Sequence, residues 1–85
     1  MYKLVYAKEA AAAITRLPAK KQRQIKDAVE RIAQDPAIGK RLTHELKGLL
    51  SYRSGDYRII YRVCHNEILV IILTVGHRKE VYERF

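Results

Sequence analysis

The sequence has few of the features that mark secreted or membrane proteins. Cys64 is its single cysteine, so an internal disulfide is excluded and a reducing compartment is favoured. The longest apolar run, Ile68 to Leu73, has six residues, far short of the roughly 18 to 20 that a membrane-spanning helix needs. The N-terminus Met1-Tyr2-Lys3-Leu4 lacks the basic-then-apolar order of a signal peptide. We therefore expect a cytoplasmic protein.

Acidic residues are also scarce. The 85 residues include 17 Lys plus Arg but only 9 Asp plus Glu, a formal net charge of +8. Residues 1–42 hold ten basic and four acidic residues (+6), and residues 43–85 hold seven and five (+2). This charge favours a polyanionic partner, such as nucleic acid, or an acidic protein.

A length of 85 residues excludes a two-domain enzyme with an interdomain cleft, so we expect one domain spanning residues 1–85. With 48% hydrophobic residues, the chain is expected to fold rather than to form a disordered basic tail.

The two prolines separate two predicted helices from the rest of the chain. Ala10, Ala13, Ile14 and Leu17 repeat with helical spacing up to Pro18, which suits the first turn of a second helix. That helix has an apolar stripe and should stop near Gln34, because the residue before a proline disfavours the α conformation. The stripe comprises Ile25, Ala28, Val29, Ile32 and Ala33, and the opposite face carries Lys20, Lys21, Arg23, Lys26 and Arg31.

Strand-like alternation marks the N-terminus and the C-terminal half. We predict strands over residues 2–6, 49–54, 57–64 and 68–75, with a basic connector over residues 37–48. Strand 68–75 is apolar on both faces, which indicates an interior position, and Gly76 is expected to end the sheet. The fold class is therefore α+β, with two N-terminal helices packed on an antiparallel sheet in the order β-α-α-β-β-β.

The predicted hairpin around Gly55-Asp56 concentrates arginines. If Gly55-Asp56 is a two-residue loop, Arg53 lies directly opposite Arg58, and Ser51 and Arg62 share their face. Facing like charges are unfavourable unless an anion lies between them, so this pairing suggests a phosphate site. A three-residue loop would change the partners, and exposed arginines with no ligand are the alternative interpretation.

The segment after the last strand carries further groups suited to RNA cleavage. His77, Arg78 and Tyr82 bring an imidazole, a guanidinium and a phenol to the end of the sheet, with Lys79 between them. Arginine can stabilise the charge that develops on phosphorus, histidine can exchange protons, and tyrosine can stack on a base. The spacings of Cys64 and the histidines match no structural zinc pattern, and no phosphate-binding glycine motif is present, so no metal or cofactor is expected.

Three segments resemble the RelE family of the RelE/ParE toxin–antitoxin superfamily. They are Leu46-Lys47-Gly48, residues 52–61 (YRSGDYRIIY) and residues 75–82 (VGHRKEVY), and with the element order they cover nearly the whole chain. The resemblance implies a microbial-RNase-like fold. It also implies a metal-independent endoribonuclease that cuts mRNA in the ribosomal A site and leaves a 2′,3′-cyclic phosphate. A cognate RelB-like antitoxin, bound in a hetero-oligomer, would inhibit it.

By position, the resemblance implies catalytic roles for Arg58, which would hold the scissile phosphate, for Arg78, which would stabilise charge or assist the leaving group, and for Tyr82, which would stack on the substrate. Arg53, Ser51, Arg62 and Lys79 are the predicted substrate-binding residues. Family members carry two lysines where this sequence has Leu49 and Ser51, so the general base differs. His77 is the candidate for proton transfer.

Two alternatives remain at this point. One is a ParE-like toxin that poisons DNA gyrase without cutting RNA; that branch generally lacks the paired arginines and the tail tyrosine. The other is a catalytically weak member that acts mainly as a co-repressor with its antitoxin.

Overall fold

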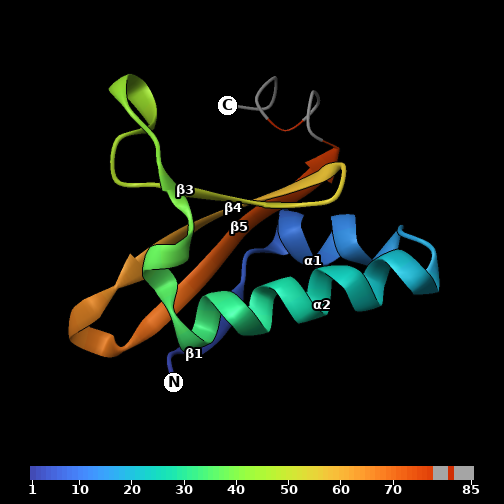
Figure 1. The fold of residues 1–85 in the computed structure, drawn as a ribbon, viewed down its shortest axis with the longest axis horizontal. Coiled ribbons are helices and arrows are strands. Elements are labelled where there is room, and N and C mark those ends of the chain that lie inside the picture. Colours follow the sequence, from blue (N-terminus) through green and yellow to red (C-terminus); the bar gives the residue numbers. More distant parts are fainter. Residues whose placement is uncertain (78–80, 82–85) are drawn as a thin grey trace.

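The fold is α+β, as predicted, with two helices on one face of a five-stranded sheet (Figure 1). The computed structural model describes residues 1–77 and residue 81. The helices are α1 (Lys8–Thr15) and α2 (Ala19–Gln34), and short 3-10 turns form η1 (Pro36–Ile38), η2 (His44–Leu46) and η3 (His65–Glu67). The strands are β1 (Lys3–Tyr6), β2 (Lys40–Arg41), β3 (Leu50–Ser54), β4 (Tyr57–Cys64) and β5 (Leu69–His77).

Proline and polar side chains set the limits of the helices. Pro18 is the N-cap of α2, and its carbonyl accepts hydrogen bonds from the backbone of the first turn. The Gln22 amide nitrogen donates to the Leu17 carbonyl at 2.9 Å, which closes the turn between the two helices. At the other end, α2 stops at Gln34 as expected, and the Asp35 carboxylate accepts the backbone N–H of Ala37. The prediction of two helices separated by Pro18 is confirmed.

The sheet differs from the prediction in two ways. Its strand order is β1-β5-β4-β3-β2. Strands β3, β4 and β5 form the predicted antiparallel meander, but β1 pairs with β5 in parallel, so the sheet is mixed. The predicted connector also contributes a two-residue strand, β2, which pairs with the start of β3. The alternation of apolar and polar residues cannot predict either feature. Both depend on which strand at the edge of the sheet the segment pairs with.

Strand β5 contains a bulge that alters which side chains share a face. Ile60 pairs with Thr74 whereas Tyr61 pairs with Ile72, so Leu73 is an extra residue in β5. Ile72 and Val75 consequently both face the helices, and both belong to the helix-side core. Strand β5 also runs through Gly76, which was expected to end the sheet, to His77.

The core lies between the helices and the sheet. Its buried members come from α1, α2, β4 and β5: Ala10, Ile25, Ala28, Val29, Ile32, Ile59, Tyr61, Val70, Ile72 and Val75. Tyr61 is completely buried; its hydroxyl donates to the Pro36 carbonyl at 2.6 Å and accepts the Gly39 N–H at 3.0 Å. A Cβ on Gly39 would lie 2.3 Å from that hydroxyl. Tyr61 therefore ties η1, which follows α2, to the middle of β4.

Candidate phosphate-binding site

Two arginines face each other across the β3–β4 hairpin. Ser54 pairs with Tyr57, so Gly55-Asp56 is the predicted two-residue loop, and Arg53 is directly opposite Arg58. The next strand places Gly76 opposite Arg58, so glycine adds no side chain to this row. We call Arg53, Arg58 and Gly76 the arginine row. Two adjacent guanidinium groups on one sheet face form an arrangement that an anion stabilises.

Side-chain hydrogen bonds orient each of the two arginines. One terminal nitrogen of Arg58 donates to the Ser51 hydroxyl at 3.3 Å, and Nε of Arg53 donates to the Gly55 carbonyl at 3.0 Å. A guanidinium group is a rigid, planar fork of five N–H donors, so a bond to one nitrogen sets the orientation of the whole group, and a fork of this shape matches a phosphate. Arg58 is half-buried and Arg53 is exposed. Arg58 thus has the more preorganised position.

A buried row of residues supports the arginine row from one side. Ser51 is 3% exposed, Thr74 is 1% exposed, and both flank Ile60 in the register. Oγ1 of Thr74 has no hydrogen-bond partner among the described residues. Ser51 is buried and accepts a hydrogen bond from Arg58, so it positions the guanidinium group of that arginine.

Arg62 lies on the same face as Arg58 but further along β4. It pairs with Ile71 and is exposed. Four residues of strand separate it from Arg58, about 14 Å at the usual strand rise. Arg62 can therefore contact a neighbouring part of an extended polyanion but not the anion that Arg58 holds.

His77 is not brought to the arginine row. It pairs with Tyr57 in the register, and the two rings meet edge to face with centroids 6.1 Å apart. The ammonium group of Lys21, in α2, lies 5.9 Å from the centre of the same tyrosine ring. Successive side chains of a strand point to opposite faces of the sheet, so in a regular strand His77 would share the face of Ile71 and Arg58. The extra residue at the bulge, Leu73, shifts this alternation by one, and His77 therefore lies on the opposite face. Three other predicted site residues, Arg78, Lys79 and Tyr82, lie outside the described residues.

The sequence reasoning missed Gln24, which holds the hairpin in place. Its amide nitrogen donates to the Ser54 carbonyl at 3.0 Å and lies 3.2 Å from the Ser54 hydroxyl. Gly55 has a φ of +61°, and a Cβ there would lie 2.6 Å from the same nitrogen. No sequence pattern marks Gln24, because its partner is 30 residues away. The contact ties the loop beside the arginine row to α2.

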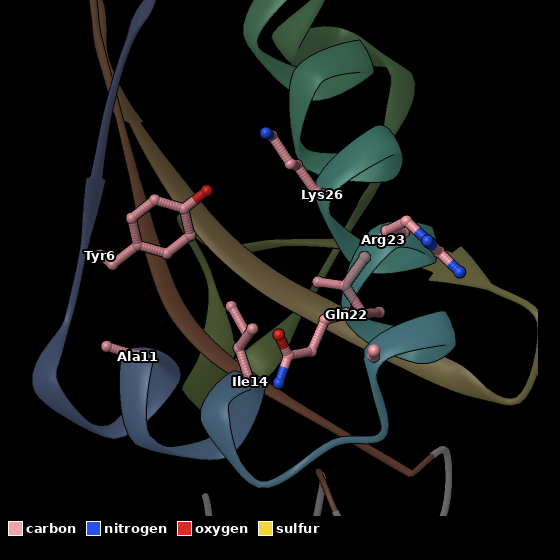
Figure 2. Close-up of a pocket in the computed structure, with 8 residues that line it drawn as sticks. Tyr6, Ala11, Ile14, Gln22, Arg23 and Lys26 are labelled. Atoms are coloured by element: carbon pink, nitrogen blue, oxygen red, sulfur yellow. The ribbon is translucent and has the colours of Figure 1, made fainter.

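A groove of about 530 Å³ lies on another part of the surface, between β1, α1 and α2. Figure 2 shows Tyr6, Ile14 and Gln22 around it, and Arg23 and Lys26 are also among its lining residues. Tyr6 is 41% exposed. Partial burial, and secondarily Glu30, raise the pKa of Tyr6 above 10. The lining is mainly apolar and the rim is basic.

Two kinds of feature are absent from the part of the chain that the structure describes. No helix there is long and apolar enough to cross a membrane. No group of three or more histidine, cysteine or acidic side chains among those residues could hold a metal ion.

Comparison with known families gives a consistent result. The family described as the ParE toxin of type II toxin–antitoxin systems matches residues 4–82. A chain in the crystal structure of the RelBE2 toxin–antitoxin complex from Mycobacterium tuberculosis is 32% identical, with a TM-score of 0.83 over 91% of this chain and 98% of that chain. The fold and the family match together define a toxin of the RelE/ParE superfamily. This chain belongs to that superfamily of type II toxins.

Other relatives agree. Toxin RelG of Mycobacterium tuberculosis is 45% identical over 47 residues, which is 55% of this chain and 54% of RelG, so the alignment spans about half of that relative. An archaeal RelE–RelB complex from Pyrococcus horikoshii OT3 has a TM-score of 0.73 at 26% identity, over 91% of this chain and 94% of that one. The isolated RelE toxin of E. coli, with a TM-score of 0.78 at 23% identity over 99% of this chain and 94% of that one, shares the fold.

Proposed function

We propose that this toxin is a metal-independent endoribonuclease that cuts mRNA on the ribosome and so inhibits translation in the cytoplasm. The observation that carries the proposal is the pair of facing arginines, with Arg58 half-buried and oriented by Ser51. A preoriented pair of cations beside a buried row of the sheet suits a phosphodiester.

In the proposed step, the 2′-oxygen of the mRNA attacks the adjacent phosphorus and the bond from phosphorus to the 5′-oxygen breaks. The 2′-hydroxyl loses its proton, and the 5′-oxygen gains one as it leaves. The products are a 2′,3′-cyclic phosphate and a 5′-hydroxyl. Arg58 holds the phosphate and stabilises its developing charge, and Arg53 adds a second guanidinium. Arg78 and Tyr82 keep their sequence-based roles of charge stabilisation and base stacking, and Lys79 and Arg62 bind flanking phosphates.

The proposal gives His77 no proton-transfer role, because its ring packs on Tyr57, on the other face of the sheet. Ser51 and Leu49 cannot replace a lysine base. We therefore expect the ribosome to help complete the site.

The partner we propose is a RelB-like antitoxin that docks in the groove between β1, α1 and α2. Solved RelE relatives were crystallised in complexes with RelB antitoxins. Apolar lining with Arg23 and Lys26 at the rim matches an amphipathic segment with acidic flanks (Figure 2).

Gyrase inhibition is the second candidate, favoured by the match to the ParE family. Brief induction of the toxin without its antitoxin separates the two. We expect rapid arrest of translation and new mRNA 5′ ends inside codons of translated messages. Intact messages together with gyrase-linked DNA breaks would contradict the nuclease and establish the alternative.

A further inference from the structure

A second hollow, of about 560 Å³, lies at the end of the hairpin opposite its turn. It is lined by Pro36 and Ala37 of η1, by residues 41–44, 47 and 48 of the connector, and by Leu50, Val63 and His65. We call it the connector pocket. Five residues of β4 separate Val63 from Arg58, about 17 Å along the strand. The connector pocket is therefore distinct from the arginine row.

The charged side chains that line this pocket, Arg41 and Lys47, are both cationic. His44 and His65 line it as well, and all four residues are exposed. Among the described residues, no carboxylate lines the pocket and neither Arg41 nor Lys47 has a recorded ion pair. Cationic side chains gathered around one concavity favour an anionic ligand. Part of the basic connector predicted over residues 37–48 therefore forms the rim of this pocket.

The backbone of the rim is held in unusual conformations. His44 has a φ of +57°, in the left-handed region that non-glycine residues rarely adopt, and Gly48 has a φ of +97°. The Lys47 N–H bonds to the His44 carbonyl at 3.1 Å and keeps this turn closed. Strain of this kind concentrates at ligand sites.

One imidazole of the rim is oriented by a neighbour. Nδ1 of His65 lies 3.0 Å from the Tyr2 hydroxyl, and the two rings meet edge to face at 5.9 Å. When the hydroxyl donates to Nδ1, the proton of the neutral ring sits on Nε2, which is then a donor. His65 can then add a directed donor to those of Arg41 and Lys47.

The rest of the pocket is apolar. Pro36 is buried, and Leu50 and Val63 are partly buried against the core. An inorganic anion would leave this surface unused, whereas a nucleotide has both a phosphate and a flat base to cover it. We propose that the connector pocket binds one nucleotide of RNA, with its phosphate on Arg41 and Lys47 and its base over Pro36, Leu50 and Val63. The proposal deepens the proposed function by adding an RNA contact outside the cleavage site.

The three histidines provide a direct test in the full-length chain. His44 and His65 line the connector pocket, while His77 lies beside Tyr57 at the other end of the hairpin. Imidazole signals should be followed by NMR while adenosine 5′-monophosphate is added. We expect the His44 and His65 signals to shift in a saturable way. Adenosine and inorganic phosphate should each bind at least tenfold more weakly, and the trinucleotide UpApU should bind more tightly than the monophosphate.

Variants locate the binding. Arg41→Gln with Lys47→Gln should weaken monophosphate binding at least tenfold. Lys20→Gln with Arg31→Gln removes the same charge from exposed positions of α2 outside the pocket and should leave binding unchanged. Amide spectra of each variant report whether it is folded. If only the His77 imidazole signal shifts, or if both double variants lose the same amount of monophosphate affinity, the connector pocket is not the binding site. If the monophosphate binds more tightly than UpApU, the ligand of the pocket is not a nucleotide within an RNA chain. None of these readouts requires mRNA cleavage, so the pocket and the nuclease can fail separately.

Discussion

Arg58 is the residue on which the proposed chemistry depends most. Replacing it with alanine removes a preoriented cation from the phosphate. Loss of one such donor typically costs about 100-fold to 1000-fold in rate. We expect Arg58→Ala to lower ribosome-dependent cleavage by that factor while antitoxin affinity, measured by calorimetry, stays within about twofold. Arg62→Ala, further along the same strand face, is the matched control and should lose far less. If both variants lose the same factor in cleavage rate, Arg58 does not hold the scissile phosphate in the way proposed.

His77 tests the face assignment in the sheet. Because its ring packs on Tyr57 rather than beside Arg58, we expect His77→Gln to retain the shape of the wild-type pH–rate profile. The profile should be measured in single-turnover cleavage on programmed ribosomes. A flattened profile in the variant would return proton transfer to His77, as the sequence alone suggested.

Tyr61 tests the tie between α2 and β4. Burial raises its pKa above the ordinary value of 10.0, with smaller opposing and reinforcing effects from Gly39, Asp35 and Tyr52. Tyr61→Phe removes the bond to the Pro36 carbonyl and leaves the Gly39 N–H without its partner, so we expect a loss of about 1–3 kcal/mol in the free energy of unfolding at pH 7. Urea denaturation measures this.

The raised pKa also predicts the sign of a pH effect. The folded state keeps the Tyr61 proton when the unfolded chain has begun to lose it. The stability contributed by this group is therefore complete below pH 10 and declines as the pH rises through the folded-state value. The stability difference between wild type and Tyr61→Phe should shrink above pH 10. A difference that is constant up to pH 11 would contradict the burial of this hydroxyl.

At the scale of elements, the β3–β4 hairpin depends on α2 for its placement. Gln24→Met keeps the length of the side chain but removes both contacts to Ser54, so we expect a loss of about 1 kcal/mol in unfolding free energy. Because the hairpin carries both arginines, cleavage should also fall, by less than in Arg58→Ala. Gln34→Met, at an exposed position at the end of α2, is the control. Unchanged stability and cleavage would show that the hairpin holds its own position.

The elements also show how far the sequence could lead. The positions of the prolines and the spacing of apolar residues were sufficient to predict where α2 begins and ends. The assumption of a two-residue loop correctly predicted that Arg53 pairs with Arg58. The parallel pairing of β1, the bulge at Leu73 and the anchor at Gln24 were not predictable, because each depends on contacts between segments distant in sequence. The bulge matters most for function, since it decides which face His77 occupies.

At the scale of the whole molecule, the arginine row proposed for cleavage and the groove proposed for the antitoxin share no residue. Ala11 is exposed and lines the groove, so Ala11→Arg fills the groove without removing core atoms. We expect this variant to remain toxic but to lose neutralisation by its antitoxin, with binding weakened at least 100-fold. Gln34→Arg adds the same charge outside the groove and should be neutralised normally. Full neutralisation of Ala11→Arg would show that the antitoxin docks elsewhere.

The division of charge fits this separation. Most of the net positive charge belongs to residues 1–42, which include both helices, whereas the arginine row belongs to the less charged half. We therefore propose that the bulk charge attracts large anionic partners and that Arg53 and Arg58 act through their positions.

The most direct test of the central claim is cleavage of a defined mRNA by the purified toxin, with and without ribosomes paused at a known codon. We expect a cut inside the A-site codon on the ribosome, upstream fragments that end in a 2′,3′-cyclic phosphate, and loss of that cut in Arg58→Ala. An intact mRNA on the ribosome, or a cut that Arg58→Ala makes at the wild-type rate, would contradict it.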